Sequence, residues 1–269
     1  MDKNSNTKKI IINIQSTKKY KSLAPQTISR IVLDTAGRFP EKQVEAEAKK
    51  KLHQIWGAYY SSRPDFKKLE IKIQEQLNEG KDLKEIVLPL LKIHASTAER
   101  IPILDDFYQK IFAITGIPES ILDHASGINA LTLPWMELPL KTNYRALDID
   151  VDEVLFINNV FKIIGAGNNK SAAVHDLFES SESADVHFLF KILPLLEQQR
   201  KGSSAEILRN LKGNYLVVSY PIASLSGQSK GMLSNYAAQC EQLILLEQWE
   251  YTKVEFSTEL IYVIKKQKK

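Results

Sequence analysis

A stripe of apolar side chains predicts an amphipathic helix in the first third of the chain. The stripe repeats at steps of three and four residues and consists of Val44, Ala48, Leu52, Ile55 and Tyr59. Two further helices are expected over 65–77 and 83–93, with Pro89 as a candidate kink in the second. Pro25 is suited to a helix start, and 37–40 reads as a break. The first third is therefore predicted to be helical.

The pattern changes from about residue 120, where short apolar runs alternate with helical stretches. The expected strands are 120–125, 144–149, 172–174, 186–190 and 215–219, followed by the closely spaced pair 251–256 and 260–264. Strands that alternate with helices indicate an α/β fold with a mostly parallel, doubly wound sheet. The terminal pair is typical of a hairpin, so one antiparallel strand is expected at the end.

The overall composition is that of a globular protein. Of 269 residues, 43% are hydrophobic and 25% are charged. No apolar run approaches the roughly 18–20 residues that a membrane-spanning helix needs, and residues 1–9 lack the apolar segment of a signal peptide. A single cysteine, Cys240, excludes an intramolecular disulfide and a cysteine-based zinc site. We therefore expect a cytoplasmic protein, and a monomer.

Positive charge is concentrated at the N-terminal end. Residues 1–92 contain 19 lysines and arginines against 11 aspartates and glutamates, whereas 93–269 contain 17 against 21. Such a bias is typical of proteins that bind a phosphate-rich partner, because each phosphate contact releases counterions and so adds affinity. Lysines that only solvate helix faces would give the same bias. We expect two parts: a helical, basic, RNA-binding region over 1–92 and an α/β domain over 93–269.

Acidic residues follow three successive predicted strands. The first strand leads through Asp123 to small residues and Gly127, which let backbone amides approach a ligand. Asp148 ends the next strand 21 residues after Gly127, close to the roughly 20 expected between a glycine turn and an acid that accepts from ribose hydroxyls. Asp176 follows the third strand, where a carboxylate can accept from the exocyclic amine of adenine. This arrangement favours a nucleotide-type cofactor, although strand ends that are acidic by chance remain the alternative.

The glycine turn also limits which cofactor fits. It lacks a full Gly-x-Gly-x-x-Gly, and the chain has no Walker lysine motif, so the turn is poorly suited to bind a pyrophosphate. S-adenosylmethionine, which carries no phosphate, is favoured over NAD or ATP. The five histidines show no metal-binding spacing, so no metal is expected. A loop rich in serine and glycine over 224–231 either closes over a substrate or is a plain connection.

These residues together resemble the aminoglycoside-resistance 16S rRNA (guanine-N7) methyltransferases, the group of ArmA, RmtB and Sgm. The most specific segment is Ile-Leu-Asp-His-Ala-Ser-Gly-Ile-Asn at 121–129. The other similar segments are 51–60, 94–100, 133–136, 148–150, 190–197, 218–221, 224–227, 230–232, 235–236 and 259–262. The resemblance implies a class I methyltransferase fold with a mostly parallel seven-stranded sheet, joined to a helical N-terminal subdomain. It implies methylation of a guanine N7 in the decoding-site helix of the assembled 30S subunit, and aminoglycoside resistance.

The resemblance also implies a set of cofactor-binding residues. They are Tyr60, His94, Ala95, Ser96, Arg100, Ala125, Gly127, Asp148, Ile149, Asp176, Leu177, Leu189 and Gln198. In this assignment Arg100 faces the methionine carboxylate, Asp148 and Ile149 hold the ribose, and Asp176 and Leu177 hold the adenine. Two positions depart from the family pattern Ala-Cys-Gly-x-Asn-Pro: Ser126 stands for cysteine and Ala130 for proline. The alanine is expected to loosen the start of the following helix.

Guanine N7 carries an exposed lone pair, so its methylation needs placement more than a general base. No catalytic side chain is therefore expected. Lys191, at the end of the fourth strand, is a candidate contact to the flipped base or a phosphate. A strand-end lysine that reaches to solvent is the alternative. Two other functions stay open, namely methylation of adenine N1 in rRNA and a catalytically inactive ribosome-binding protein of the same fold.

Overall fold

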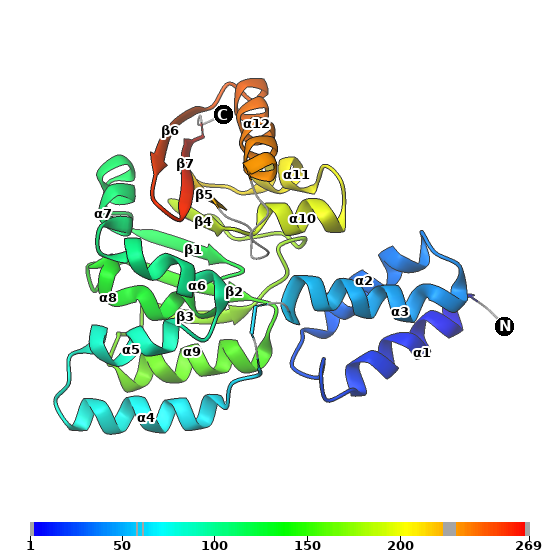
Figure 1. Ribbon diagram of the computed structural model, residues 1–269, viewed down its shortest axis with the longest axis horizontal. Coiled ribbons are helices and arrows are strands. Elements are labelled where there is room, and N and C mark those ends of the chain that lie inside the picture. Colours follow the sequence, from blue (N-terminus) through cyan, green and yellow to red (C-terminus); the bar gives the residue numbers. More distant parts are fainter. Residues whose placement is uncertain (1–2, 58, 61, 223–229, 267–269) are drawn as a thin grey trace.

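The computed structural model describes residues 3–57, 59–60, 62–222 and 230–266 (Figure 1). Its centre is a seven-stranded sheet in the order β3-β2-β1-β4-β5-β7-β6. The strands are β1 Ser120–His124, β2 Asn143–Asp148, β3 Lys170–Val174, β4 Val186–Phe190, β5 Tyr215–Pro221, β6 Glu250–Glu255 and β7 Glu259–Lys265. Each of these strands overlaps one of the predicted apolar runs.

The first five strands are parallel to one another, and β7 is antiparallel to both β5 and β6. The predicted antiparallel element is therefore confirmed. Register places Asp123 beside Ala146, and Asp148 beside Val174. As a result, the ends of β1, β2 and β3 lie at one edge of the sheet, which is where ligands bind in open α/β folds.

Helices cover both faces of the sheet. The helical segments are α1 Lys3–Ser16, α2 Pro25–Ala36, α3 Glu41–Leu52, η1 His53–Gly57, α4 Phe66–Asn78, α5 Leu83–Leu91, α6 Ala95–Arg100, η2 Ile101–Ile103, α7 Leu104–Thr115, η3 Gly127–Thr132, α8 Leu133–Met136, α9 Val151–Ile163, α10 Leu193–Gln199, α11 Ser203–Asn210 and α12 Lys230–Leu246. One apolar core joins α4, α5, α7, α8 and α9 to one face, and a second core joins α10, α11 and α12 to the other. Side chains that alternate along the strands supply both cores, as Phe188 and Leu189 do on opposite faces.

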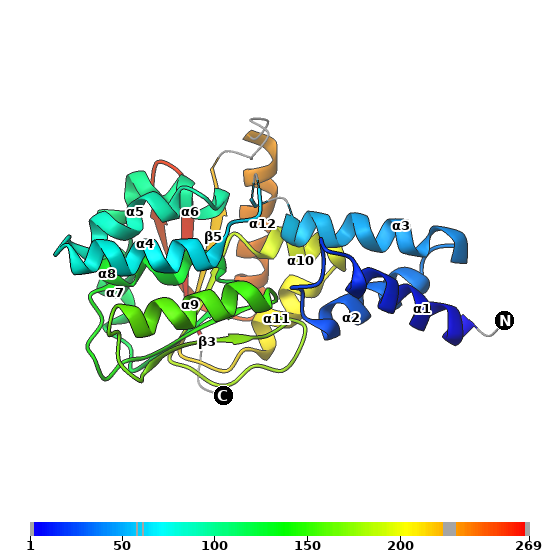
Figure 2. The same ribbon diagram turned by 90° about the horizontal axis from the view of Figure 1, so that it is seen from below.

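The N-terminal helices α1, α2 and α3 form a lobe beside the sheet, here named the N-terminal module (Figures 1 and 2). Its core contains Ile14, Ile28 and Leu52, all fully buried. The predicted helix over 44–59 is shorter than expected, since α3 ends at Leu52 and continues as the π-helical turn η1.

The division of the chain predicted at residue 92 is not the place where the hydrophobic cores change. Helix α4 packs on α9 through Phe66 and Phe156, whose rings lie 4.7 Å apart. Helix α5 places Leu90 and Leu91 in the same core as the sheet. Core membership thus changes between α3 and α4, so the helical N-terminal third divides into the module and two helices that complete the sheet domain. In the described part of the chain, no helix is long and apolar enough to cross a membrane.

Candidate functional site

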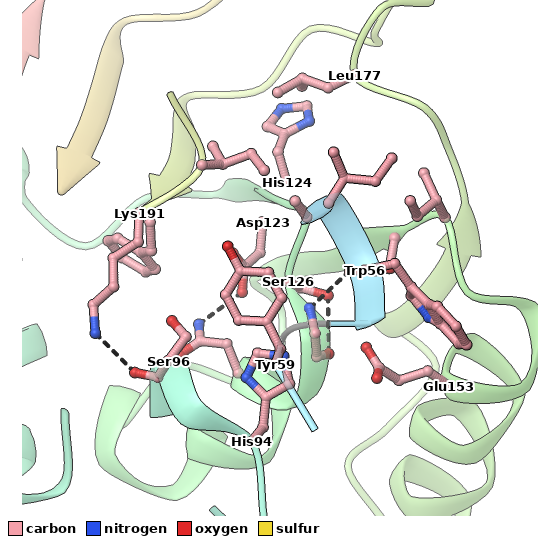
Figure 3. A pocket seen from close by; sticks show the side chains of 18 of the residues that line it. Trp56, Tyr59, His94, Ser96, Asp123, His124, Ser126, Glu153, Leu177 and Lys191 are labelled. Carbon is pink, nitrogen blue, oxygen red and sulfur yellow. Dashed lines mark hydrogen bonds between the residues drawn. The ribbon is translucent and has the colours of Figure 1, made fainter. Parts of the chain in front are cut away.

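A cavity with about 990 Å³ of empty space, part of it open to solvent, lies at the carboxyl ends of the parallel strands (Figure 3). It is bounded by β1, β2, β3 and β4 on the sheet side and by α2, η1 and α6 on the other. Its lining residues are Arg30, Ile55, Trp56, Tyr59, Tyr60, His94, Ser96, Arg100, Asp123, His124, Ala125, Ser126, Gly127, Asn129, Asp148, Ile149, Glu153, His175, Asp176, Leu177, Phe190, Lys191, Ile192, Leu196 and Gln199. The polar ends of four strands therefore meet residues from the N-terminal third.

The turn after β1 brings backbone amides to the cavity. Ala125 and Gly127 both have positive φ, at 48° and 51°. For an alanine this is a strained conformation of the kind that collects at ligand sites. A Cβ on Gly127 would lie 3.1 Å from Nε2 of His94, so glycine is needed there for space as well as for conformation.

The turn and the predicted ribose acid are in direct contact. The Gly127 N–H donates to Asp148 Oδ2 at 2.9 Å, and the Asp150 N–H donates to Oδ1 at 3.1 Å. Burial nevertheless raises the pKa of Asp148 to about 6. The carboxylate is thus held in place by backbone amides, with its remaining acceptor capacity toward the cavity.

The adenine end predicted from sequence contains Asp176 and Leu177, which are both buried. Arg30, from the N-terminal module, donates through Nε to Asp176 Oδ2 at 2.9 Å and through Nη2 to Oδ1 at 3.3 Å. Both terminal nitrogens of Arg30 also lie 3.2 Å from Gln199 Oε1. Asp176, which follows β3 in the sheet domain, is consequently bonded to a side chain of the N-terminal module.

A buried charge network forms the opposite end of the cavity. Arg100 donates through Nε and Nη2 to the two carboxylate oxygens of Glu259, each at 2.9 Å, and through Nη1 to Asn129 Oδ1 at 2.6 Å. Lys191 Nζ lies 3.2 Å from Glu259 Oε1 and 2.8 Å from Glu99 Oε2. Burial by itself would raise the pKa of Glu259, but the charges of Arg100 and Lys191 lower it. The network therefore pairs two cations, Arg100 and Lys191, with two carboxylates, Glu259 and Glu99, so its formal charges balance.

Aromatic side chains close the cavity from the side of η1 and the segment that follows it. Tyr59 stacks on His94 with ring centroids 5.2 Å apart (Figure 3). Tyr60 meets the same imidazole edge-on, with ring centroids 5.0 Å apart. Burial, followed by the charges of Lys191 and Arg100, lowers the pKa of His94 to about 4. The imidazole is therefore neutral at physiological pH and contributes a flat wall rather than a charge.

Three residues implied by the resemblance do not line this cavity: Ala95, Leu189 and Gln198. The Ala95 N–H donates to Tyr59 O at 3.0 Å and so supports the wall from behind. Leu189 is fully buried in the core on the far side of β4, because alternate residues of a strand face opposite ways. Gln198 is exposed, and its neighbour Gln199 lines the cavity instead. The other ten implied residues are brought together here.

Several lining residues were not among those expected from the sequence. Trp56 donates through Nε1 to Asp150 Oδ2 at 2.6 Å, and Tyr60 O–H donates to Glu153. Burial and the nearby charges of Asp148 and Asp150 raise the pKa of Glu153 well above its ordinary value. The acid-rich run 148–153 was the available signal for this cluster. Nothing local in the sequence links Arg30 to the strand ends.

The cavity suits a polar ligand of nucleoside type. Three side-chain atoms that are buried without a partner in the described part of the chain belong to its walls: Nδ1 of His94, Oδ1 of Asp123 and Nδ1 of His124. Orphaned buried polar atoms are costly and are commonly satisfied by a ligand or water. No group of histidine, cysteine and acidic residues that could hold a metal ion occurs within the described ranges. The predicted closing loop over 224–231 lies largely outside the described residues, which resume at Lys230.

Comparison with known proteins identifies relatives over almost the whole chain. A family model described as ribosomal RNA methyltransferase (FmrO) matches residues 16–263. A 16S rRNA (guanine(1405)-N(7))-methyltransferase of Micromonospora echinospora is 34% identical over 260 residues, which cover 94% of each chain. A protein of the same name from Proteus mirabilis is 31% identical over 269 residues, or 95% of each chain.

Solved structures agree with these sequence relatives. The 16S rRNA methyltransferase RmtF in complex with S-adenosyl-L-homocysteine superimposes with a TM-score of 0.83 at 30% identity, covering 99% of this chain and all of RmtF. The 16S rRNA methylase RmtB gives a TM-score of 0.78 at 31% identity over 99% of each chain. The likeness therefore includes the N-terminal module and not only the sheet domain.

Proposed function

The chain belongs to the FmrO family of ribosomal RNA methyltransferases, and from this we propose that it methylates N7 of a guanine in 16S rRNA. S-adenosylmethionine is the methyl donor. The relatives are named for guanine 1405, and we take the same nucleotide as the target of this chain. The observation that carries the proposal is the cavity in which the glycine turn, Asp148, Asp176 and Arg100 converge.

Each end of the cavity fits one part of the cofactor. Asp148 is placed to accept from the ribose hydroxyls beside the Gly127 turn, and Asp176 to accept from the adenine amine. Arg100, whose positive charge is partly balanced by Glu259, is placed to hold the methionine carboxylate. The carboxylate of Glu259, which pairs with Arg100, is buried. The guanidinium of Arg100 is therefore held in one orientation before a ligand binds.

The chemistry explains why the site shows no general base. S-adenosylmethionine, when bound, supplies a methyl group on a positively charged sulfur. The side chains would orient the reactants and exclude water, so that placement rather than proton transfer would speed the reaction. His94 is neutral and stacked on Tyr59, so it serves as a wall for the reacting groups.

Lys191 belongs to the Arg100 network and also lines the cavity. It is buried, which does not fit a lysine that extends to solvent, and it donates to Ser96 O at 2.9 Å (Figure 3). It also donates to Glu99 Oε2 at 2.8 Å. Its positive φ of 57° fixes the backbone at the end of β4. We propose that Lys191 anchors α6 against the sheet, because its ammonium group is shared among Ser96 O, Glu99 and Glu259.

The N-terminal module supplies the surface for RNA. Lys18, Lys19, Lys21, Lys42 and Lys50 are exposed on it. Phosphate contacts from these lysines would supply the energy that turns the guanine out of its helix, a cost of about a few kcal/mol. We propose the assembled 30S subunit in the cytoplasm as the substrate, a monomeric enzyme, and resistance to aminoglycosides that bind the decoding site as the consequence.

Transfer of radiolabelled methyl from S-adenosylmethionine to purified 30S subunits tests the proposal. We expect label in 16S rRNA, with competitive inhibition by S-adenosylhomocysteine. A folded preparation that binds S-adenosylhomocysteine and transfers no label would support the inactive ribosome-binding alternative instead. Label that resides in adenine would support the adenine-N1 alternative.

A further inference from the structure

Arg30 connects the N-terminal module to the adenine end of the cavity. It lies in α2, and its guanidinium bridges the carboxylate of Asp176 and the side-chain oxygen of Gln199. Asp176 follows β3 and Gln199 ends α10. One side chain from the module thus joins two separate walls of the site.

The contacts leave these groups little freedom to turn. The guanidinium carbon of Arg30 lies over the ring of Phe178, 4.0 Å from its centroid, so the group makes a cation–π contact as well as hydrogen bonds. The Phe178 N–H donates to Asp176 Oδ1 at 3.1 Å. Gln199 Nε2 in turn donates to Leu195 O at 3.3 Å. Both acceptor side chains are therefore held by partners on more than one side.

We propose that Arg30 is a positioning residue that sets the recognition of the adenine 6-amino group. The inference rests on the proposed S-adenosylmethionine site. An ionised carboxylate offers about four acceptor positions and no donor. Arg30 and Phe178 occupy those on the protein side and so direct the remaining acceptor capacity of Asp176 into the cavity. Without the guanidinium, the buried carboxylate would lose its charge partner and turn or become solvated.

This arrangement makes the module part of the cofactor site. A purine that carries a 6-oxo group instead of the amine would place an acceptor against an acceptor, which is strongly disfavoured in a fixed, buried site. Discrimination between the two purines depends on how rigidly Asp176 is held. It therefore depends on α2 as much as on β3.

Isothermal calorimetry on the full chain tests this with S-adenosylhomocysteine and its 6-oxo counterpart, S-inosylhomocysteine. Arg30→Lys keeps the charge but removes the planar fork that spans Asp176 and Gln199. We expect it to weaken S-adenosylhomocysteine by about tenfold or more, equivalent to about 1.4 kcal/mol, and to lower the preference over the 6-oxo ligand. Arg38→Lys is the matched control, because Arg38 donates only to the backbone oxygen of Gln199, at 3.1 Å; both affinities should stay at the wild-type value.

Three results would overturn the inference. The first is an unchanged affinity of Arg30→Lys for S-adenosylhomocysteine. The second is a tighter affinity, which would mean that Arg30 competes with adenine. The third is an equal loss of affinity for both ligands, which would indicate a structural role alone. If Arg30→Lys does not fold, as judged by its thermal midpoint, Gln199→Leu removes the second anchor and must show the same loss of preference. A wild-type chain that binds neither ligand contradicts the proposed function itself and is distinguishable from all of these.

Discussion

Arg100 and Glu259 form a bidentate ion pair in the interior, with two N···O distances of 2.9 Å. The side chains are 1% and 0% exposed, and they join α6 to β7 across 159 residues of sequence. A pair so placed fixes the guanidinium that faces the cavity. Its removal should affect both folding and cofactor binding.

Glu259→Gln is expected to lower the free energy of unfolding by about 3–5 kcal/mol, because it leaves the charges of Arg100 and Lys191 buried without their shared partner. Urea denaturation measures this. Glu250→Gln is the control, since Glu250 pairs with Lys265 at 3.5 Å on the surface and such pairs contribute about 0–1 kcal/mol. Equal effects of the two substitutions would contradict the network described above.

Cofactor affinity should fall with acidity through the titration of Asp148. Its pKa in the folded protein is raised to about 6, so the ionised form that accepts from ribose is depleted as the pH falls through that value. With a pKa of about 6, affinity for S-adenosylhomocysteine should be about fourfold weaker at pH 5.5 than at pH 7.5. In the ligand-free protein, the raised pKa means that the folded state holds the Asp148 proton more tightly than the unfolded state. The contribution of Asp148 to the free energy of unfolding therefore increases as the pH falls.

Asp148→Asn is the control for that dependence. It should weaken binding at neutral pH and remove the contribution of Asp148 to the profile. The part that remains would come from Asp123, whose pKa burial raises to about 6, and from Glu153, whose pKa burial also raises. His94 does not titrate in this window, because its pKa is about 4. An unchanged profile in Asp148→Asn would assign the dependence elsewhere.

Gly127→Ala should destabilise the protein by about 1–2 kcal/mol from backbone strain at positive φ and should also weaken S-adenosylhomocysteine. The added methyl meets His94 at 3.1 Å. Gly165→Ala has a similar φ of 64° but no heavy atom within 4 Å of the new methyl. It should show the strain alone and bind ligand normally; if it weakens the ligand as much, crowding at His94 is not the cause.

Charge reversal on the N-terminal module should separate RNA binding from cofactor binding. Lys18→Glu combined with Lys21→Glu should weaken 30S binding and reduce its salt dependence, since phosphate contacts release counterions. Filter binding at several salt concentrations measures this. Lys141→Glu combined with Lys162→Glu, at two exposed residues outside the module, is the charge-matched control. S-adenosylhomocysteine affinity should be unchanged in both proteins, and a loss confined to the control would place the RNA elsewhere.

The five parallel strands were predictable because such strands appear as short apolar runs, and each of these runs became part of a strand. The acids at their ends followed from the same pattern. Helix ends were less predictable: nothing in 44–59 signals that α3 gives way to a π-helical turn at His53. The choice of Gln199 over Gln198 depends on one helical position, which a sequence match leaves ambiguous by a residue.

Side-chain contacts between residues far apart in the chain could not be predicted from the sequence. Arg30 meets Asp176 across 146 residues, and neither residue carries a local sign of the other. Helices α4 and α5 show the same limit, because they look like the module in helicity, and only packing joins them to the sheet. Local pattern predicts elements, whereas tertiary packing decides which elements share a core.

The account depends most on the atom that is methylated. Treatment of the modified 16S rRNA with borohydride and aniline cleaves the chain at N7-methylguanine, and primer extension then locates the cut. The account predicts one new cut, at the guanine for which the relatives are named, position 1405, and only after incubation of 30S subunits with enzyme and S-adenosylmethionine. Methyl incorporation without a cut at that guanine would contradict it.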